Sequence, residues 1–409
     1  MISCFRSADI LLPKFRNDPE RMKKWACVAC DQYTSEPDYW ERVGKFVGDA
    51  PSTLRVTLPE IWLDEAGKRI PGINRTMRVY LDTILESHPD SMIYLERTLK
   101  NGKVRKGLVG AVDLECYDYT KGAKSLVRAT EGTVLERIPP RVRIREGAPI
   151  ELPHIMILID DPGKTVIEPL SGKDFEPAYD FDLMENSGHV KGSFVTEKER
   201  ERILASLDKL AAGTNPLLFA MGDGNHSLAS AKAFWEEIKP TLTGSGRLTH
   251  PARYALCEIV NIHDDALDFE PIYRVLFGVD PEKVTSELEN YAKSLPESSL
   301  PAQTVTVVTT KGEKDIVFEN PTSFLPVGTL QTFLDDFAKR HGAKTDYIHG
   351  TDSVRKLVSE NSVGFVFKGM EKSDLFPTVI ADGALPRKTF SMGEADDKRF
   401  YLEARKITE

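Results

Sequence analysis

The chain has 409 residues, of which 41% are hydrophobic and 29% are charged, and its formal net charge is -9. This length allows a large buried core and predicts about two or three domains, while the acidic balance argues against a nucleic-acid-binding protein, which usually carries a basic face. The longest apolar runs, such as residues 155–159, are too short to span a bilayer. Residues 1–9 lack the apolar core of a signal peptide, so we expect a cytoplasmic protein with no membrane or nucleic-acid partner.

The five cysteines are an odd number, which fits a reducing compartment. Cys27 and Cys30 form a CxxC pair, a spacing found in redox sites and in half of a zinc site. No second pair with ligand spacing follows it. We therefore interpret both residues as small buried side chains of a strand over residues 25–30.

Residues 31–47 predict a turn followed by a helix. Ser35 and Asp38 have the spacing of a capping box, and an apolar stripe at helical spacing follows them. Asp31 then lies where a buried strand ends, and functional side chains are common at such positions. A carboxylate that closes a turn is the alternative interpretation of Asp31.

The middle of the chain predicts a hairpin and an arginine-rich strand. Residues 77–87 indicate a helix, and residues 92–97 and 108–114 indicate strands on either side of the hairpin dipeptide Asn101-Gly102. Arg141, Arg143 and Arg145 alternate with apolar residues, so in a strand they would share one face. Such a row suits a polyphosphate, and a solvated sheet face is the alternative.

Residues 154–159 are the clearest buried strand of the chain. The strand ends at Asp160-Asp161-Pro162, where two adjacent acids can hold Mg²⁺ or begin a turn. Thr196 and Glu199 then have the spacing of another capping box, and they open a helix that ends near Gly213.

Residues 216–232 form the pattern on which the functional prediction depends. A short apolar run over residues 217–221 indicates a buried strand, and a glycine-bearing turn leads from it into a helix with one apolar face. In such a turn the free backbone N–H groups of the helix N-terminus point outward. Together with the helix dipole they suit a bound phosphate.

Polar side chains of the same turn add chemistry to this N-terminus. Asp223 supplies a carboxylate for a metal ion or a hydroxyl group, Asn225 an amide, and His226 a group that transfers protons. The alternative is an ordinary turn in which Asn225 or Ser227 caps the helix.

The rest of the chain predicts a supporting region. Residues 241–249 are rich in Thr, Gly and Ser and mark a boundary. The elements expected after it are a strand over 254–261, a helix over 281–295, a hairpin over 304–318, a helix over 330–341 and a strand over 363–367. We therefore expect an α+β protein with mixed sheets, a catalytic phosphate-binding region over residues 1–240, and a C-terminal α+β region over 241–409.

The stretch Asp223-Gly-Asn-His226, followed by Ser227-Leu-Ala-Ser-Ala-Lys232, resembles the signature of a large bacterial family labelled as a domain of unknown function. That signature is similar to the phosphate-binding motif of free serine kinases, which belong to the ParB/sulfiredoxin-like superfamily. Four further stretches agree with the unknown-function family: Ala29-Cys-Asp-Gln-Tyr-Thr-Ser-Glu-Pro-Asp-Tyr-Trp40, Ala129-Thr-Glu-Gly-Thr-Val-Leu-Glu-Arg-Ile-Pro-Pro-Arg141, Tyr347-Ile-His-Gly350 and Leu385-Pro-Arg-Lys-Thr-Phe-Ser-Met-Gly393.

The resemblance implies a ParB/sulfiredoxin-like phosphate-binding core and the phosphorylation of free L-serine to O-phospho-L-serine. Asp31 falls where free serine kinases have a catalytic glutamate, although it is a shorter acid, and Glu36 is the second candidate for the base. His226 would contact the phosphoryl group. The donor could be pyrophosphate, ADP or ATP, because no adenine pocket can be identified in the sequence.

The other site residues are expected in three groups. The phosphate-binding residues are Gly224, Asn225, His226, Ser227, Arg128 and, from a late segment that lies over the active site in the kinases, Lys388 and Thr389. Glu131 and Thr133 are expected at the substrate, and Asp223 at a Mg²⁺ ion. The alternative function is a ParB-like nucleotide-binding regulatory protein without small-molecule turnover.

Overall fold

The computed structural model describes residues 4–132, 138–213 and 216–409. They divide into two compact units. Among the described residues, the first unit contains 4–129, 138–213, 216–267 and 393–409, and the second contains 130–132 and 268–392. The expected boundary between residues 240 and 241 falls inside the first unit, because the strand Tyr254–Asn261 pairs on both sides with strands of that unit.

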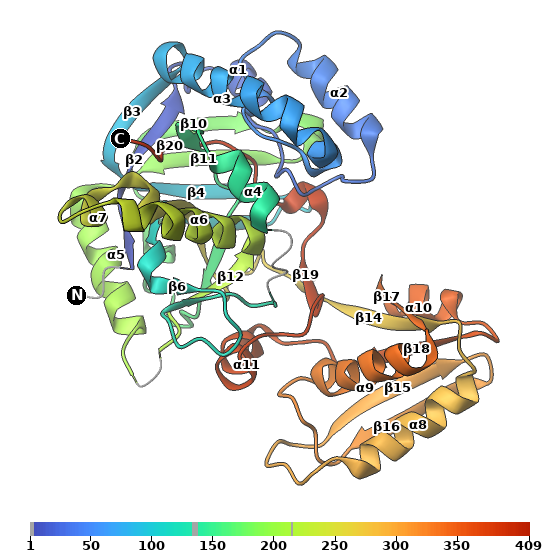
Figure 1. Ribbon diagram of the computed structural model, residues 1–409. Coiled ribbons are helices and arrows are strands. Elements are labelled where there is room, and N and C mark those ends of the chain that lie inside the picture. The colour runs from blue at the N-terminus through green and yellow to red at the C-terminus, as the bar shows by residue number, and fades with distance from the viewer. Residues whose placement is uncertain (1–3, 133–137, 214–215) are drawn as a thin grey trace. The chain divides into compact units, whose positions relative to one another are not determined.

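The first unit is built on a mixed ten-stranded sheet (Figure 1). Its strands are β1 (Phe5–Arg6), β4 (Ile93–Thr98), β5 (Val104–Asp113), β6 (Tyr117–Asp118), β7 (Val127–Arg128), β9 (Met156–Ile159), β10 (Glu176–Asp182), β11 (His189–Phe194), β12 (Phe219–Asp223) and β13 (Tyr254–Asn261). They run in the order β10-β11-β4-β5-β13-β9-β12-β7-β6, with β1 on β5. Because β13 is parallel to β9 while β12 is antiparallel to it, the sheet is mixed, as the sequence predicted.

Helices and two small sheets surround this sheet. The helices are α1 (Pro19–Trp25), α2 (Pro37–Val47), α3 (Ala66–Thr83), α4 (Ile138–Arg145), α5 (Glu197–Leu210), α6 (Asn225–Ile238) and α7 (Gly246–Thr249). The small sheets pair β2 (Ala8–Pro13) with β3 (Leu85–Ser91) and β8 (Ile150–Glu151) with β20 (Arg405–Lys406).

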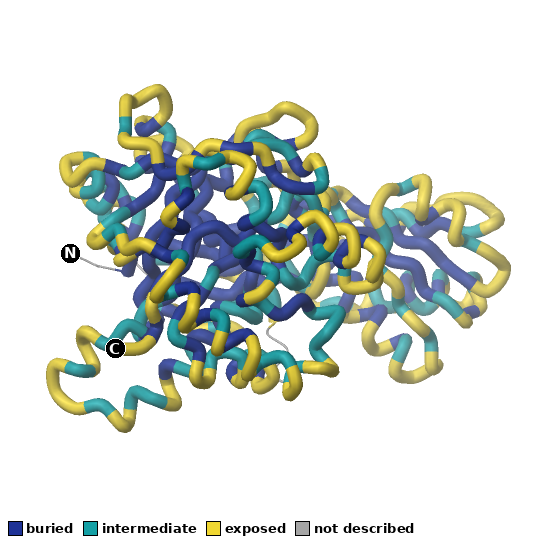
Figure 2. The backbone as a smooth tube through the Cα atoms, turned by 90° about the horizontal axis from the view of Figure 1, so that it is seen from above, coloured by how far each residue is buried: buried dark blue, intermediate teal, exposed yellow. Residues whose placement is uncertain are grey.

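Side chains alternate between the two faces of the large sheet and fill two cores. In β5, Val109 packs in a cluster with Trp25 of α1, whereas Leu108 packs in a cluster with Trp235 of α6. This is the period of two that a strand buried on both faces requires. Figure 2 shows the buried backbone concentrated inside each unit.

The second unit is an α+β sandwich of its own. A six-stranded sheet contains β14 (Phe269–Phe277), β15 (Gln303–Thr309), β16 (Gly312–Phe318), β17 (Lys344–His349), β18 (Ser362–Phe367) and β19 (Phe390–Met392). Its helices are α8 (Pro281–Ser294), α9 (Pro326–His341), α10 (Thr351–Leu357) and α11 (Leu375–Asp382). The predicted hairpin over 304–318 and the predicted helices over 281–295 and 330–341 are confirmed within a few residues.

The predicted strand over residues 25–30 is wrong. Trp25 ends α1, and the chain continues without regular structure, with only a bridge between Val28 and Phe400. The backbone N–H of Ala29 donates to the carbonyl of Arg399 at 3.0 Å. The apolar composition of this segment predicted a strand. In the structure the segment is buried, but its backbone contacts residues 399–400 and not a neighbouring strand of a sheet. Both cysteines of the CxxC pair are free thiols.

The predicted arginine strand is also wrong, because residues 138–145 form helix α4. Ile138 and Val142 lie four residues apart on the buried face of this helix and pack against Ala229 of α6. Pro139 and Pro140 stand in its first turn, where the missing N–H groups cost nothing. The three arginines therefore do not share a face.

The two predicted capping boxes do not form. Helix α2 begins at Pro37 with Glu36 as its N-cap, not Ser35. Thr196 is the N-cap of α5 as predicted, but no side chain caps that helix, and Glu199 instead pairs with Lys173 and with Arg202.

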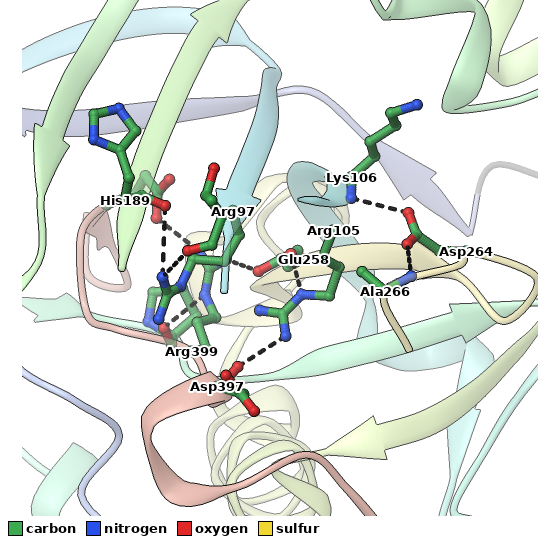
Figure 3. Close-up of polar contacts among 12 residues, drawn as sticks. Arg97, Arg105, Lys106, His189, Glu258, Asp264, Ala266, Asp397 and Arg399 are labelled. Carbon is green, nitrogen blue, oxygen red and sulfur yellow. Dashed lines mark hydrogen bonds and ion pairs between the residues drawn. The ribbon is translucent and has the colours of Figure 1, made fainter. Parts of the chain in front are cut away.

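The C-terminal residues 393–409 are held in the first unit by buried charges (Figure 3). The side chain of Arg399 is 2% exposed and pairs with Glu258 of β13 and with Glu403. Arg97 and Arg105 face each other across β4 and β5, and they donate to the carbonyls of Asp396 and Asp397, both at 2.8 Å. Burial, and then the charge of Arg105, lowers the pKa of Arg97 to about 9.

Among the helices that the structure describes, none has the length and apolar composition needed to cross a membrane.

Candidate functional site

The candidate site begins where β12 passes into α6. Gly224 joins the two elements with a φ of +77°, a conformation that side chains other than glycine rarely adopt. A Cβ atom on Gly224 would lie 3.1 Å from the Cα of Ile155, so the glycine also allows the turn to approach the chain before β9. The predicted strand–turn–helix is thereby confirmed.

Helix α6 begins without a side-chain cap. Gly224 is the N-cap, so neither Asn225 nor Ser227 takes that role. The N–H groups of a helix's first turn have no partner inside the helix, and the dipole places partial positive charge at the same point. The side-chain oxygen of Asn225 is buried and accepts no hydrogen bond from any described residue. The donors that an anion would meet at this N-terminus are therefore the backbone N–H groups of the first turn, not the Asn225 oxygen.

A buried histidine connects this N-terminus to the chain's end. The Ser227 hydroxyl lies 3.0 Å from Nε2 of His154, and Nδ1 of His154 lies 2.9 Å from the hydroxyl of Tyr401. The backbone N–H of Cys30 donates to the same tyrosine hydroxyl at 3.2 Å. One chain of hydrogen bonds thus runs from α6 to the residue before Asp31.

Asp223, Lys398 and Asp31 add charges near the N-terminus of α6. Nζ of Lys398 is 3.5 Å from Oδ2 of Asp223, whose other oxygen accepts the N–H of Gly224 at 2.8 Å. Burial opposes ionisation of Asp31, but the charge of His154, a hydrogen bond from Gln32 and the charge of Lys398 outweigh it, so the pKa of Asp31 is lowered. Asp31 is therefore ionised at neutral pH. We call Asp31, His154, Asp223, Ser227, Lys398 and Tyr401 the α6 cluster.

A pocket of about 120 Å³ opens beside the α6 cluster. Its polar end contains Cys30, His154, Ser227 and Tyr401, and its walls include the apolar side chains of Val56, Leu58, Leu63, Met77, Ile144 and Ile150. Burial, and then the charge of Asp31, raises the pKa of Cys30 to about 12, so this thiol is protonated at neutral pH.

The structure brings together six of the residues expected at the site. Asp223, Gly224, Asn225, His226 and Ser227 lie in one turn of chain, and the charges of His154 and Lys398 act on Asp31 by lowering its pKa. Glu36 is exposed at the start of α2.

The guanidinium of Arg128 joins two segments of backbone. It donates to the carbonyls of Ser125 at 2.7 Å and Pro216 at 3.1 Å, so it ties together the chain around β7 and the approach to β12. The contact of Arg128 with a phosphate remains a prediction.

Three expected residues belong to the second unit: Glu131, Lys388 and Thr389. The carbonyl of Lys388 accepts a hydrogen bond from the fully buried Arg274, and the hydroxyl of Thr389 donates to the carbonyl of Pro386 at 2.6 Å. These contacts shape the segment before β19, and the roles of the three residues at a phosphate remain predictions. Thr133 lies outside the described residues.

Sequence reasoning missed His154, Lys398 and Tyr401. The sequence indicated His154 only as the polar end of a buried strand. Its hydrogen-bond partners, Ser227 and Tyr401, lie far away in the sequence. The late contribution was expected from Lys388 and Thr389, whereas Lys398 and Tyr401, which contact Asp223 and His154, come after Gly393. The signal available was the density of polar and aromatic residues between 394 and 403.

A metal site is not preformed in the part of the chain that the structure describes, where no group of three or more His, Cys, Asp or Glu residues could hold an ion. Mg²⁺ usually needs less from a protein, because one or two carboxylates bind it together with substrate phosphates. Asp223 offers a carboxylate of this kind at the N-terminus of α6. Mg²⁺ therefore remains a prediction.

A family model described as "Protein of unknown function (DUF1015)" matches residues 12–363. No curated protein matches the chain. Among solved structures, a free serine kinase in complex with AMP is similar at 11% identity and a TM-score of 0.38, covering 75% of this chain and 93% of that one. A conserved hypothetical protein from Pyrococcus furiosus is similar at 11% identity and a TM-score of 0.35, covering 75% of this chain and 96% of that one.

Proposed function

This chain belongs to the family described as "Protein of unknown function (DUF1015)", and from its site we propose that it is a phosphotransferase whose acceptor is the hydroxyl group of free L-serine. The observation that carries the proposal is the uncapped N-terminus of α6 inside the α6 cluster. The choice of L-serine as the acceptor rests on the resemblance of the motif in residues 223–232 to that of free serine kinases.

The donor's phosphates would lie against the first turn of α6. The backbone N–H groups there, the Ser227 hydroxyl and the ammonium of Lys398 all favour negative charge. Asp223 would hold Mg²⁺ together with phosphate oxygens, and the ion supplies charge neutralisation there. Positioning and charge neutralisation are the main demands of phosphoryl transfer.

Asp31 would act as the general base. Its lowered pKa, which the charges of His154 and Lys398 help to produce, keeps it ionised at neutral pH. The serine oxygen attacks the transferred phosphorus, the bond from phosphorus to the donor's bridging oxygen breaks, and the hydroxyl proton passes to Asp31. His154 is fixed by Ser227 on one side and Tyr401 on the other, so it keeps the cluster in register.

The test is a screen of pyrophosphate, ADP and ATP against a panel of amino acids, with products read by phosphorus NMR. The expected result is O-phospho-L-serine from one donor class. Binding of a nucleotide without any phosphorylated product from any pair would contradict the proposal and favour the nucleotide-binding regulatory protein. A soak with pyrophosphate should also place an anion against residues 225–227.

A further inference from the structure

The first strand of the chain places one cysteine beside another that is distant in the sequence. β1 pairs with β5 in antiparallel register, and the backbone N–H of Asp113 at the end of β5 donates to the carbonyl of Cys4 at 2.9 Å. One turn of 3₁₀ helix, Leu114–Cys116, follows β5 directly. The side chains of Cys4 and Cys116 are hydrogen-bonded to each other. Two free thiols thus meet at this edge of the first unit.

The turn that carries Cys116 is fixed by its own side chains. Asp113 caps the turn by accepting the backbone N–H of Glu115 at 3.0 Å, and its carboxylate pairs with Arg253 at 2.7 Å. The carboxylate of Glu115 accepts a hydrogen bond from the indole N–H of Trp235 in α6. Because strand pairing fixes the backbone at one thiol and these contacts fix it at the other, the two thiols are held together by the fold itself.

The two thiols differ in exposure and in acidity. Cys4 is fully buried in the core, whereas Cys116 is only partly buried. The hydrogen bond from Cys4 is the main cause that lowers the pKa of Cys116, and it outweighs the opposing effect of burial, while the pKa of Cys4 is raised. The thiolate is the form of a cysteine that attacks an oxidant. Cys116 is therefore the reactive member of the pair, with Cys4 in place to react with it.

The CxxC pair has different surroundings. Cys27 is 1% exposed, and its sulfur lies 3.4 Å from the hydroxyl of Ser52. Cys30 is hydrogen-bonded to Tyr401. Burial raises the pKa of both thiols, that of Cys30 to about 12, so both are protonated at neutral pH. The two cysteines whose spacing matches a redox motif are therefore less reactive than Cys116.

We propose that Cys4 and Cys116 are a redox site, which a peroxide converts into a reversible disulfide. The Cys116 thiolate attacks one oxygen of hydrogen peroxide, the O–O bond breaks, and the departing hydroxide takes up a proton to form water. Cys116 is then a sulfenic acid. The Cys4 sulfur attacks the Cys116 sulfur, the S–O bond breaks, and the Cys4 proton leaves with that oxygen as a second water. The two electrons lost by the thiol pair reduce the peroxide, and a dithiol reductant restores both thiols.

The test treats the native full chain with hydrogen peroxide and maps its disulfides by mass spectrometry of unreduced peptides. The expected product is a cross-linked pair of peptides that contain Cys4 and Cys116, lighter by two hydrogen atoms than the separate peptides. A dithiol should remove the cross-link.

Serine variants separate the two steps of the reaction. Cys116→Ser should lose the cross-link. Cys4→Ser should accumulate a sulfenic acid at Cys116, which dimedone traps, because the partner that resolves it is missing. Cys30→Ser is the matched control: Cys30 is also partly buried, but its pKa is raised, so this variant should form the cross-link at the rate of the unaltered protein.

Four results would overturn the proposal. They are a cross-link between Cys27 and Cys30, a cross-link between two copies of the chain, oxidation of Cys116 beyond the sulfenic acid without any cross-link, and a protein whose thiols all survive the peroxide. The peptide map of the unaltered protein distinguishes these results from the expected one, so the test holds even where a serine variant fails to fold. Phosphoryl transfer takes no part in it, so its outcome is independent of the proposed function.

Discussion

Asp31 is the residue on which the proposed proton transfer depends. Asp31→Asn should keep donor binding and lower kcat by about 10²–10⁴, the usual contribution of a general base. The measurement is kcat together with the dissociation constant of the donor. Glu36→Gln is the control, because Glu36 is exposed at the start of α2. Full activity in Asp31→Asn with a collapse in the control would transfer the role to Glu36.

His154 is a positioning residue, and its effect should appear in the pH profile. Its charge is the leading influence that lowers the pKa of Asp31 against the effect of burial. A base with a lowered pKa stays ionised until the pH falls through that lowered value, so removing the charge raises the pKa of Asp31. The acid limb of kcat should therefore move to higher pH in His154→Gln.

The control for this variant is Tyr401→Phe, which removes the hydroxyl bonded to His154 and leaves the imidazole in place. It should shift the acid limb less than His154→Gln. A lower kcat with an unmoved acid limb in His154→Gln would mean that the histidine supports only the fold.

At the scale of elements, the turn between β12 and α6 depends on Gly224. Gly224→Ala introduces both an unfavourable φ and a Cβ atom 3.1 Å from the Cα of Ile155. We expect a loss of about 1–3 kcal/mol in the free energy of unfolding, and a weaker affinity for pyrophosphate because the N-terminus of α6 shifts.

Gly102→Ala is the matched control, because Gly102 has a similar φ of +82° and no atom within 4 Å of the added Cβ. It should show the cost of the conformation alone and leave pyrophosphate affinity unchanged. Equal affinity in both variants would contradict a phosphate site at this turn. Denaturant titration and calorimetry supply the two quantities.

Elements with local signals could be predicted from the sequence. The strand before Gly224, helix α6 and the hairpin at Gly102 follow from apolar periodicity and glycine turns, and all three form. The strand prediction for residues 141–145 was wrong because arginines alternate there with apolar residues, as in a strand. The four-residue spacing of Ile138 and Val142 and the two adjacent prolines are the features typical of the helix that forms.

The part of the site that could not be predicted depends on contacts between distant residues. His154 meets Tyr401 across 247 positions of sequence, and Cys30 meets the same residue across 371. Neither contact produces a periodic pattern in the sequence from which it could be predicted. Asp31 and the loop at Gly224 each carried a signal of their own, but nothing in the sequence placed them beside Lys398.

At the scale of the whole molecule, the C-terminal segment is locked into the first unit by Arg399. Arg399→Met removes the positive charge that pairs with the buried carboxylates of Glu258 and Glu403. Removing one partner of a buried ion pair lowers the free energy of unfolding by about 3–5 kcal/mol. Denaturant unfolding measures the change. Since Lys398 and Tyr401 flank this anchor, activity should fall with it.

Arg355→Met provides the comparison, because Arg355 pairs with Glu313 at the surface of the second unit. Exposed pairs contribute about 0–1 kcal/mol, so this variant should be nearly as stable as the unaltered protein. A similar small change in Arg399→Met would show that the buried cluster does not hold the segment.

The return of residues 393–409 to the first unit has a consequence for synthesis of the protein. The ribosome releases the turn at Gly224 and helix α6 long before it makes Lys398 and Tyr401, and the second unit is translated in between. A nascent chain that stops before Gly393 therefore carries the loop without the lysine beside Asp223 and without the tyrosine that holds His154. The α6 cluster is therefore complete only once residues 398–401 have been translated, after the whole second unit.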